Sequence, residues 1–142
     1  MYFEEFFLGQ KFRSSEFNAA EKRIIGFSKV YDNIPLHTDP EYAKTTRFKK
    51  LISSGFMTFL DAWKEFIEQN AFGDELIAGK SASMEWFAPV FADDILVSDC
   101  TVTKLTQRNA HNGIVEVTIC VYKKGETNCL MKATVETVVK RK

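Results

Sequence analysis

The strongest constraint on the fold is a change in the spacing of apolar residues near the middle of the chain. Between Gly55 and Gln69 the apolar side chains recur every three or four residues, which predicts an amphipathic helix. After Gly79 they alternate with polar side chains, which predicts β-strands. The helix has six large apolar side chains on one face: Phe56, Phe59, Leu60, Trp63, Phe66 and Ile67. We expect something broad, such as one face of a sheet, to cover them.

The second half of the chain supplies the strands of that sheet. Alternating segments occur at residues 83–88, 95–105, 115–121 and 131–136. Asn112-Gly113 and Lys124-Gly125 are predicted to form turns between them. Helices followed by four antiparallel strands indicate the α+β class, in which one long helix fills the concave face of a curved sheet. Trp63 and Trp86 are expected to anchor the core.

Shorter elements are predicted in the first half of the chain. They are a strand at residues 10–17, a helix at 18–31 and a short helix at 39–46. Asn18 and Glu21 have the spacing of a capping box at the start of the first helix. Asp39 followed by proline is typical of an N-cap at the start of the second.

Length and charge exclude several classes of protein. The 142 residues suit one domain, 1–142, that buries a core without metal or disulfide support. Nineteen basic and nineteen acidic residues give no net charge, which argues against a general nucleic-acid or membrane-surface binder. No apolar stretch approaches the roughly 20 residues of a membrane span. The three cysteines, Cys100, Cys120 and Cys129, form no close pair, and we expect free thiols in a cytoplasmic protein.

The residues best suited to chemistry lie between the two predicted helices. Asp32 precedes His37 by five residues, and Pro35 stands between them. Pro35 fixes its own φ and keeps Ile34 out of the α region, so the segment is predicted to be a shaped turn and not a helix interior. Aspartate and histidine are well suited to moving protons near neutral pH. From the spacing alone, a catalytic pair and a hydrogen-bonded turn are equally supported. No cluster of residues has the spacing of a metal site.

This segment and the order of the elements resemble those of the MaoC-like acyl dehydratases, relatives of the (R)-specific enoyl-CoA hydratases. The resemblance rests on segments spread along the chain: 3–12, 32–40, 47–48, 53–58, 86–90, Asp94 and 113–121. It implies the hot-dog fold, a curved antiparallel β-sheet wrapped around a long central α-helix. It also implies a hydro-lyase acting, without a cofactor, on 2-enoyl or 3-hydroxyacyl thioesters of coenzyme A or acyl carrier protein. Hot-dog enzymes commonly form homodimers or dimers of dimers.

The resemblance assigns roles to individual residues. Asp32 and His37 would activate water, and the backbone N–H groups at Gly55, where the central helix begins, would stabilise an enolate-like oxygen. Ser54 stands where many relatives have histidine, and Ser54 and Phe56 are expected to contact substrate.

Two further positions leave alternatives open. The run of Lys44, Arg47, Lys49 and Lys50 suits either a solvated loop or the phosphates of coenzyme A, and we take Arg47 as a substrate-binding candidate. Ile34 occupies a position near the substrate where the family usually has a side-chain amide. This departure favours, as the second interpretation, a non-catalytic or specialised acyl-thioester-binding protein. A thioesterase is the third, because the fold supports many functions.

Overall fold

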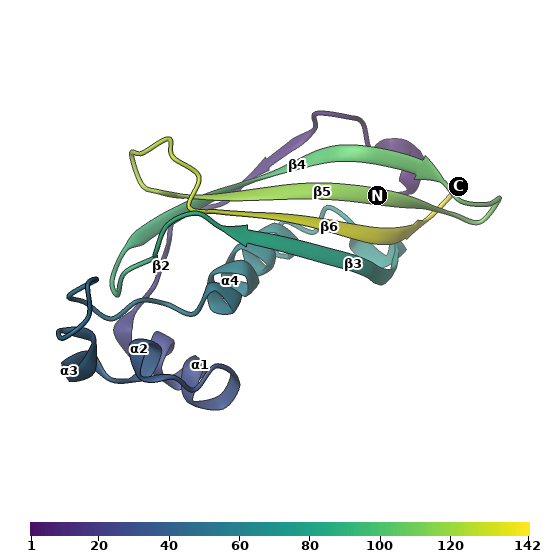
Figure 1. The fold of residues 1–142 in the computed structure, drawn as a ribbon. Coiled ribbons are helices and arrows are strands. Elements are labelled where there is room, and N and C mark those ends of the chain that lie inside the picture. Colours follow the sequence, from purple (N-terminus) through teal and green to yellow (C-terminus); the bar gives the residue numbers. More distant parts are fainter.

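The computed structural model describes residues 1–142 and shows a curved antiparallel sheet over a long helix, with a small helical lobe at one end (Figure 1). The strands are β1 (Lys11–Arg13), β2 (Phe17–Asn18), β3 (Leu76–Trp86), β4 (Ile95–Gln107), β5 (Asn112–Lys123) and β6 (Met131–Lys140). The α-helices are α1 (Glu21–Tyr31), α2 (Pro35–Thr38), α3 (Pro40–Ala43) and α4 (Gly55–Ile67), with 3₁₀ turns η1 (Phe3–Glu5) and η2 (Gly73–Glu75). The predicted α+β class is confirmed.

The sheet has the order β1-β4-β5-β6-β3, and β2 also pairs with β4. The predicted alternation is clearest in β5, where Val115, Val117, Ile119 and Val121 are all buried. These side chains belong to one apolar core that also includes Phe66 of α4. The helix therefore lies against the concave face of the sheet, as its amphipathic pattern predicts.

Two predictions about strands and turns are wrong. The strand predicted at residues 10–17 is split into β1 and β2, because Ser14 donates its N–H to the Ser98 carbonyl and its hydroxyl accepts the Ser98 N–H. The turn expected at Asn112-Gly113 lies earlier, since both residues belong to β5. There Asn109 Oδ1 accepts from the N–H groups of His111 and Asn112 and so closes the turn.

The predicted capping box of α1 is also wrong. The helix begins at Glu21 after Ala20, and no side chain of its own segment caps it. Instead the Glu21 N–H donates to Asp93 Oδ1, 3.3 Å away, from the connection between β3 and β4. The cap is thus provided by a residue 72 positions further along the chain, which local spacing does not reveal.

The face that α4 buries agrees only in part with the predicted one: Phe66 is buried and Phe59 and Trp63 pack against the core as expected, but the other three predicted side chains do not. Met57, Thr58, Ala62 and Phe66 are the buried residues of α4, whereas Phe56, Leu60 and Ile67 are exposed. The sheet of one chain covers only one side of this helix. β3, at the free edge of the sheet, is likewise exposed along most of its length. Trp86, expected in the core, is 44% exposed at the end of this strand.

The helical lobe carries the residues singled out by the sequence. Ile34 is extended, as Pro35 requires, but Pro35 begins the single-turn helix α2, so His37 lies in a helical turn and not in the irregular turn predicted. The predicted cap of α3 is confirmed, since Asp39 Oδ1 accepts from the N–H groups of Glu41 and Tyr42. No helix of the structure has the length and apolar character needed to cross a membrane.

Candidate active site

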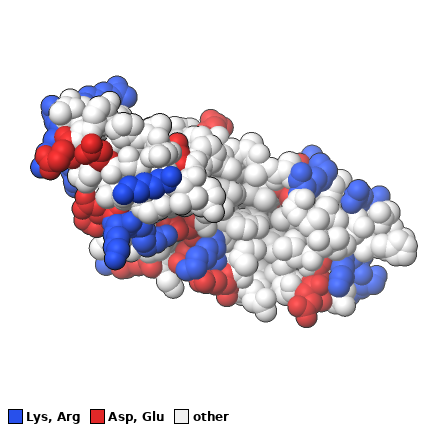
Figure 2. All heavy atoms as spheres, turned by 90° about the horizontal axis from the view of Figure 1, so that it is seen from below, with Lys and Arg blue, Asp and Glu red and all other residues white.

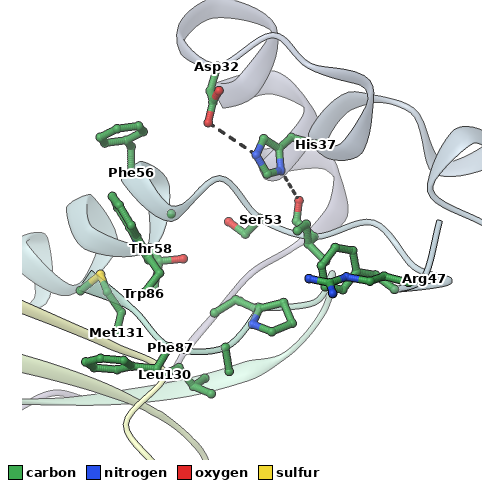
Figure 3. A pocket seen from close by; sticks show the side chains of 16 residues that line it. Asp32, His37, Arg47, Ser53, Phe56, Thr58, Trp86, Phe87, Leu130 and Met131 are labelled. Atoms are coloured by element: carbon green, nitrogen blue, oxygen red, sulfur yellow. Dashed lines mark hydrogen bonds and ion pairs between the residues drawn. The ribbon is translucent and has the colours of Figure 1, made fainter. Parts of the chain in front are cut away.

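A cavity of about 350 Å³ lies between the helical lobe, the start of α4 and the segment that follows β3 (Figure 3). Polar side chains on its wall are Asp32, His37, Arg47, Ser53 and Thr58, and most of the remaining lining is apolar. A mostly apolar hollow with a few convergent polar groups is the usual form of a small-molecule site.

His37 is held in one orientation by the backbone. Its Nδ1 lies 2.8 Å from the carbonyl oxygen of Ile52. Ile52 is itself fixed by an isolated antiparallel bridge to Phe91. Because a carbonyl only accepts, Nδ1 carries a proton, and in the neutral imidazole Nε2 is left as an acceptor. The side chain of His37 is 10% exposed, and Nε2 faces Asp32.

Asp32 is positioned by two contacts at the end of α1. Its backbone N–H donates to the Ser28 carbonyl, and its Oδ2 accepts from Ser54 Oγ at 2.7 Å. The same Oδ2 lies 3.5 Å from His37 Nε2, longer than a direct hydrogen bond. Two acceptor atoms therefore stand next to each other at the cavity wall, a spacing suited to binding one water molecule between them.

The start of α4 offers backbone donors. Met57 and Thr58 donate their N–H groups to the Ser54 carbonyl, whereas the N–H groups of Gly55 and Phe56 donate to no acceptor of the protein. The first N–H groups of a 13-residue helix, together with its dipole, favour negative charge. The cavity wall at Gly55 is therefore electrostatically suited to an anionic oxygen.

Gly55 also has the close-packing role that the sequence left open as an alternative, and the structure shows that its partner is Trp86. A Cβ built on this residue would lie 2.2 Å from Nε1 and 2.4 Å from Cε2 of Trp86. The indole thus rests on the Cα of Gly55 and forms part of the cavity wall, edge-on to Phe56.

Of the other site residues predicted from the sequence, some line the cavity and some do not. Arg47 and Phe56 line the cavity with Asp32, His37 and Gly55. Ser54 is fully buried behind the wall and contacts Asp32. Ile34 does not line the cavity, and it is 44% exposed where α2 begins.

Several cavity residues were missed by the sequence reasoning. Ser53 and Thr58 flank the start of α4, and their hydroxyls point into the cavity in Figure 3. Both lie inside the 53–58 segment, so the segment was found but not these side chains. Leu130 and Met131 reach the cavity only because Met131 pairs with Trp86 across strands β6 and β3. Nothing in their local sequence indicates this.

Metal binding has no evident site in the structure. No group of three or more His, Cys, Asp or Glu side chains is placed to hold an ion.

Comparison with known families identifies the fold and the family. The model of the MaoC-like domain matches residues 5–123, most of the chain. The chain belongs to the MaoC-like domain family. The MaoC-like dehydratase of Rhodospirillum rubrum superposes with a TM-score of 0.89 at 23% identity, over 100% of this chain and 98% of that one. The (R)-hydratase of A. caviae, involved in PHA biosynthesis, superposes with a TM-score of 0.75 at 25% identity, over 98% and 99%.

The fold is therefore the hot-dog fold, and the family is one of hydratases and dehydratases. A curated relative, the uncharacterized protein YdeM of Bacillus subtilis, is 29% identical over 142 residues, covering 99% of this chain and 100% of its own. The likeness to this relative extends along the whole length of the chain.

Proposed function

We propose that this protein is a hydro-lyase that adds water to 2-enoyl thioesters, or removes it from 3-hydroxyacyl thioesters. The observation that carries the proposal is the pair of acceptors, His37 Nε2 and Asp32 Oδ2, 3.5 Å apart on the wall of a cavity at the start of α4. This pair can grip a water molecule, and the free backbone donors face the place where negative charge would develop. Membership of the MaoC-like family supports the same reaction class.

His37 and Asp32 have distinct roles in the proposed reaction. The Ile52 carbonyl holds the Nδ1 proton, so Nε2 accepts a proton from water as the water oxygen forms a bond to C3. Asp32 keeps the water in place, and Ser54 keeps Asp32 in place. The π electrons of the C2=C3 bond move to C2 and the thioester oxygen. The protonated His37 then returns the proton to C2, so that one water has been added across the double bond and the imidazole is neutral again. Dehydration follows the same steps in reverse.

The N–H groups of Gly55 and Phe56 stabilise the enolate-like thioester oxygen. They are fixed by the helix before substrate arrives, so no rearrangement is needed when the charge forms. Loss of one such donor costs about 10²–10³-fold in rate in well-studied acyl-transfer enzymes. Only proline would remove one of these N–H groups, and its ring would also change the packing at the start of α4. For this reason the tests use the side chains around these donors.

The rim of the cavity suits the phosphates of the thioester carrier. Arg47 lies at this rim with its guanidinium 4.8 Å from the centre of the Phe48 ring, and no carboxylate pairs with it. Lys49 and Lys50, which follow closely, make no ion pair either. We therefore place the phosphate groups of coenzyme A or of a carrier protein's pantetheine arm at Arg47, where guanidinium and phosphate oxygens pair well.

The active form is proposed to be a homodimer formed through the free edge of the sheet. Figure 2 shows a wide surface in the middle of one face that is almost without charged side chains. Leu60 of α4 and Ile77 of the edge strand β3 are large apolar residues that one chain leaves exposed. A second copy joined along β3 would satisfy the edge strand and cover α4. It would also bring a second wall to the open cavity.

One assay tests the reaction class against both alternatives. A series of enoyl-CoA esters of increasing chain length is monitored for loss of the conjugated double bond and, in parallel, for release of free thiol. Hydration without thiol release supports the hydro-lyase, whereas thiol release alone indicates a thioesterase. The non-catalytic alternative rested on Ile34, which does not line the cavity.

Two variants, Asp32→Asn and His37→Gln, test whether these side chains act in the hydration reaction. Both variants keep the size of the side chain and an acceptor for local contacts, so they should fold normally and lose about 10²–10⁴-fold in turnover. His111→Gln, in the exposed loop before β5, is the matched control and should behave as wild type. Turnover that survives in either site variant at the wild-type level would rule out the proposed pair.

A further inference from the structure

Thr58 presents to the cavity a hydroxyl that has no hydrogen-bond partner in the protein. The residue is 3% exposed, lies in α4 and lines the cavity. Figure 3 shows its oxygen directed towards the centre of the cavity, with no interaction drawn to any neighbour. A hydroxyl on a residue with so little exposed surface normally has a hydrogen-bond partner, because leaving it unpaired is unfavourable. This oxygen is therefore available to a molecule that fills the cavity.

The reason for the free hydroxyl lies in the carbonyl of Ser54. A helical threonine can donate to a carbonyl of the preceding turn, and the carbonyl four residues before Thr58 is that of Ser54. Here the Ser54 carbonyl already accepts from the N–H groups of Met57 and Thr58, at 3.1 and 3.2 Å, and from Ser53 Oγ at 3.2 Å. With the carbonyl occupied by three donors, the Thr58 hydroxyl turns to the cavity.

Its place on α4 indicates which substrate atom it meets. Thr58 follows Gly55 by three residues, so the two share a helix face, and side chains of a helix lean towards its N-terminus. The hydroxyl thus lies above the turn that holds the free N–H groups of Gly55 and Phe56. Resting on the function proposed above, we infer that the Thr58 hydroxyl donates a third hydrogen bond to the thioester oxygen. Thr58 is then a catalytic residue of the hydration.

The test measures the polarity of the thioester carbonyl directly. Saturated butyryl-CoA labelled with ¹³C at C1 binds without reacting, and isotope-edited infrared spectroscopy reads its carbonyl stretch. In Thr58→Val, which keeps the shape of the side chain, the stretch should move to higher frequency. In the same variant kcat for enoyl-CoA hydration should fall about 10²–10³-fold, as for other oxyanion donors, with little change in KM.

Two controls separate this role from packing. Thr58→Ser keeps the hydroxyl and should bring the carbonyl frequency back to that of wild type. Thr103→Val removes an exposed hydroxyl of β4 outside the cavity and should leave both frequency and kcat unchanged. Thermal unfolding of Thr58→Val confirms that the variant folds.

An unchanged frequency in Thr58→Val overturns the inference, whether or not kcat falls. The infrared measurement is also independent of the proposed reaction, because the labelled thioester binds without reacting. If wild type binds the labelled thioester but hydrates no enoyl ester, the hydro-lyase proposal fails, and the frequency shift still decides whether Thr58 contacts the carbonyl. If the labelled thioester does not bind at all, both proposals fail.

Discussion

Substitution of Gly55 by alanine distinguishes the two roles of this glycine. The added Cβ would lie 2.2, 2.4 and 2.8 Å from three ring atoms of Trp86, well inside van der Waals contact. The indole must shift, and overpacking of this kind typically costs about 1–3 kcal/mol. Alanine is a better helix former than glycine by up to about 1 kcal/mol, which offsets part of that cost. We expect a net loss of about 1–2 kcal/mol in the free energy of unfolding.

A double-mutant cycle with Trp86→Ala isolates the free-energy cost of the clash between the added Cβ and the indole. Once the indole is gone, the added Cβ has room, and Gly55→Ala should be neutral or stabilise by up to about 1 kcal/mol. The expected coupling between the two positions is therefore about 1–3 kcal/mol, measured by urea unfolding of all four proteins. Equal effects of Gly55→Ala in both backgrounds, within about 0.5 kcal/mol, would refute the packing argument.

Activity in the same four proteins tests the substrate role. If glycine is needed only for the indole, Gly55→Ala in the Trp86→Ala background should hydrate enoyl-CoA as fast as Trp86→Ala alone. A further loss of kcat in that background would show that the substrate needs residue 55 to have no side chain.

Other consequences of the structure can be checked separately. Arg47→Gln should raise KM for an enoyl-CoA about fivefold, as expected for losing about 1 kcal/mol of binding free energy. KM for the N-acetylcysteamine thioester, which lacks phosphates, should not change. Equal changes for both substrates would place the phosphates elsewhere. Leu60→Glu should convert a dimer of about 33 kDa, twice the 16.3 kDa chain, into monomers in light scattering, and a wild-type monomer that turns over substrate would exclude the dimer proposal. Burial raises the pKa of the Cys100 thiol to about 12, so at pH 8 this cysteine should stay unlabelled by a thiol reagent until the protein unfolds, and rapid labelling in the folded state would contradict its burial. Ile34→Asn should change turnover by less than about twofold, because the side chain does not line the cavity, and a larger gain would restore the sequence-based expectation that an amide here supports the site.

The sequence predicted well what depends on the periodicity of apolar residues. A period of about 3.6 at residues 55–69 and a period of two along β5 report local geometry, which each segment adopts wherever its apolar side is covered. The extended Ile34 before Pro35 and the Asp39 cap are equally local, since each involves only neighbouring atoms. Asp32, His37 and Gly55, which line the cavity, were found for a different reason, because they lie in motifs that resemble those of a known family.

Contacts between distant segments decided the rest. The cap of α1 comes from Asp93, and Met131 reaches the cavity through its pairing with Trp86. The sheet covers only one side of α4, so Leu60 stays exposed although its spacing places it with the buried residues. The sequence by itself determined which residues can form helix and strand, because those properties are local, and it named Asp32 and His37 as candidates for proton transfer. Only the tertiary structure decided which hydroxyl stays unpaired and which faces are left open, since hydrogen bonding and burial depend on neighbours that the chain brings together by folding.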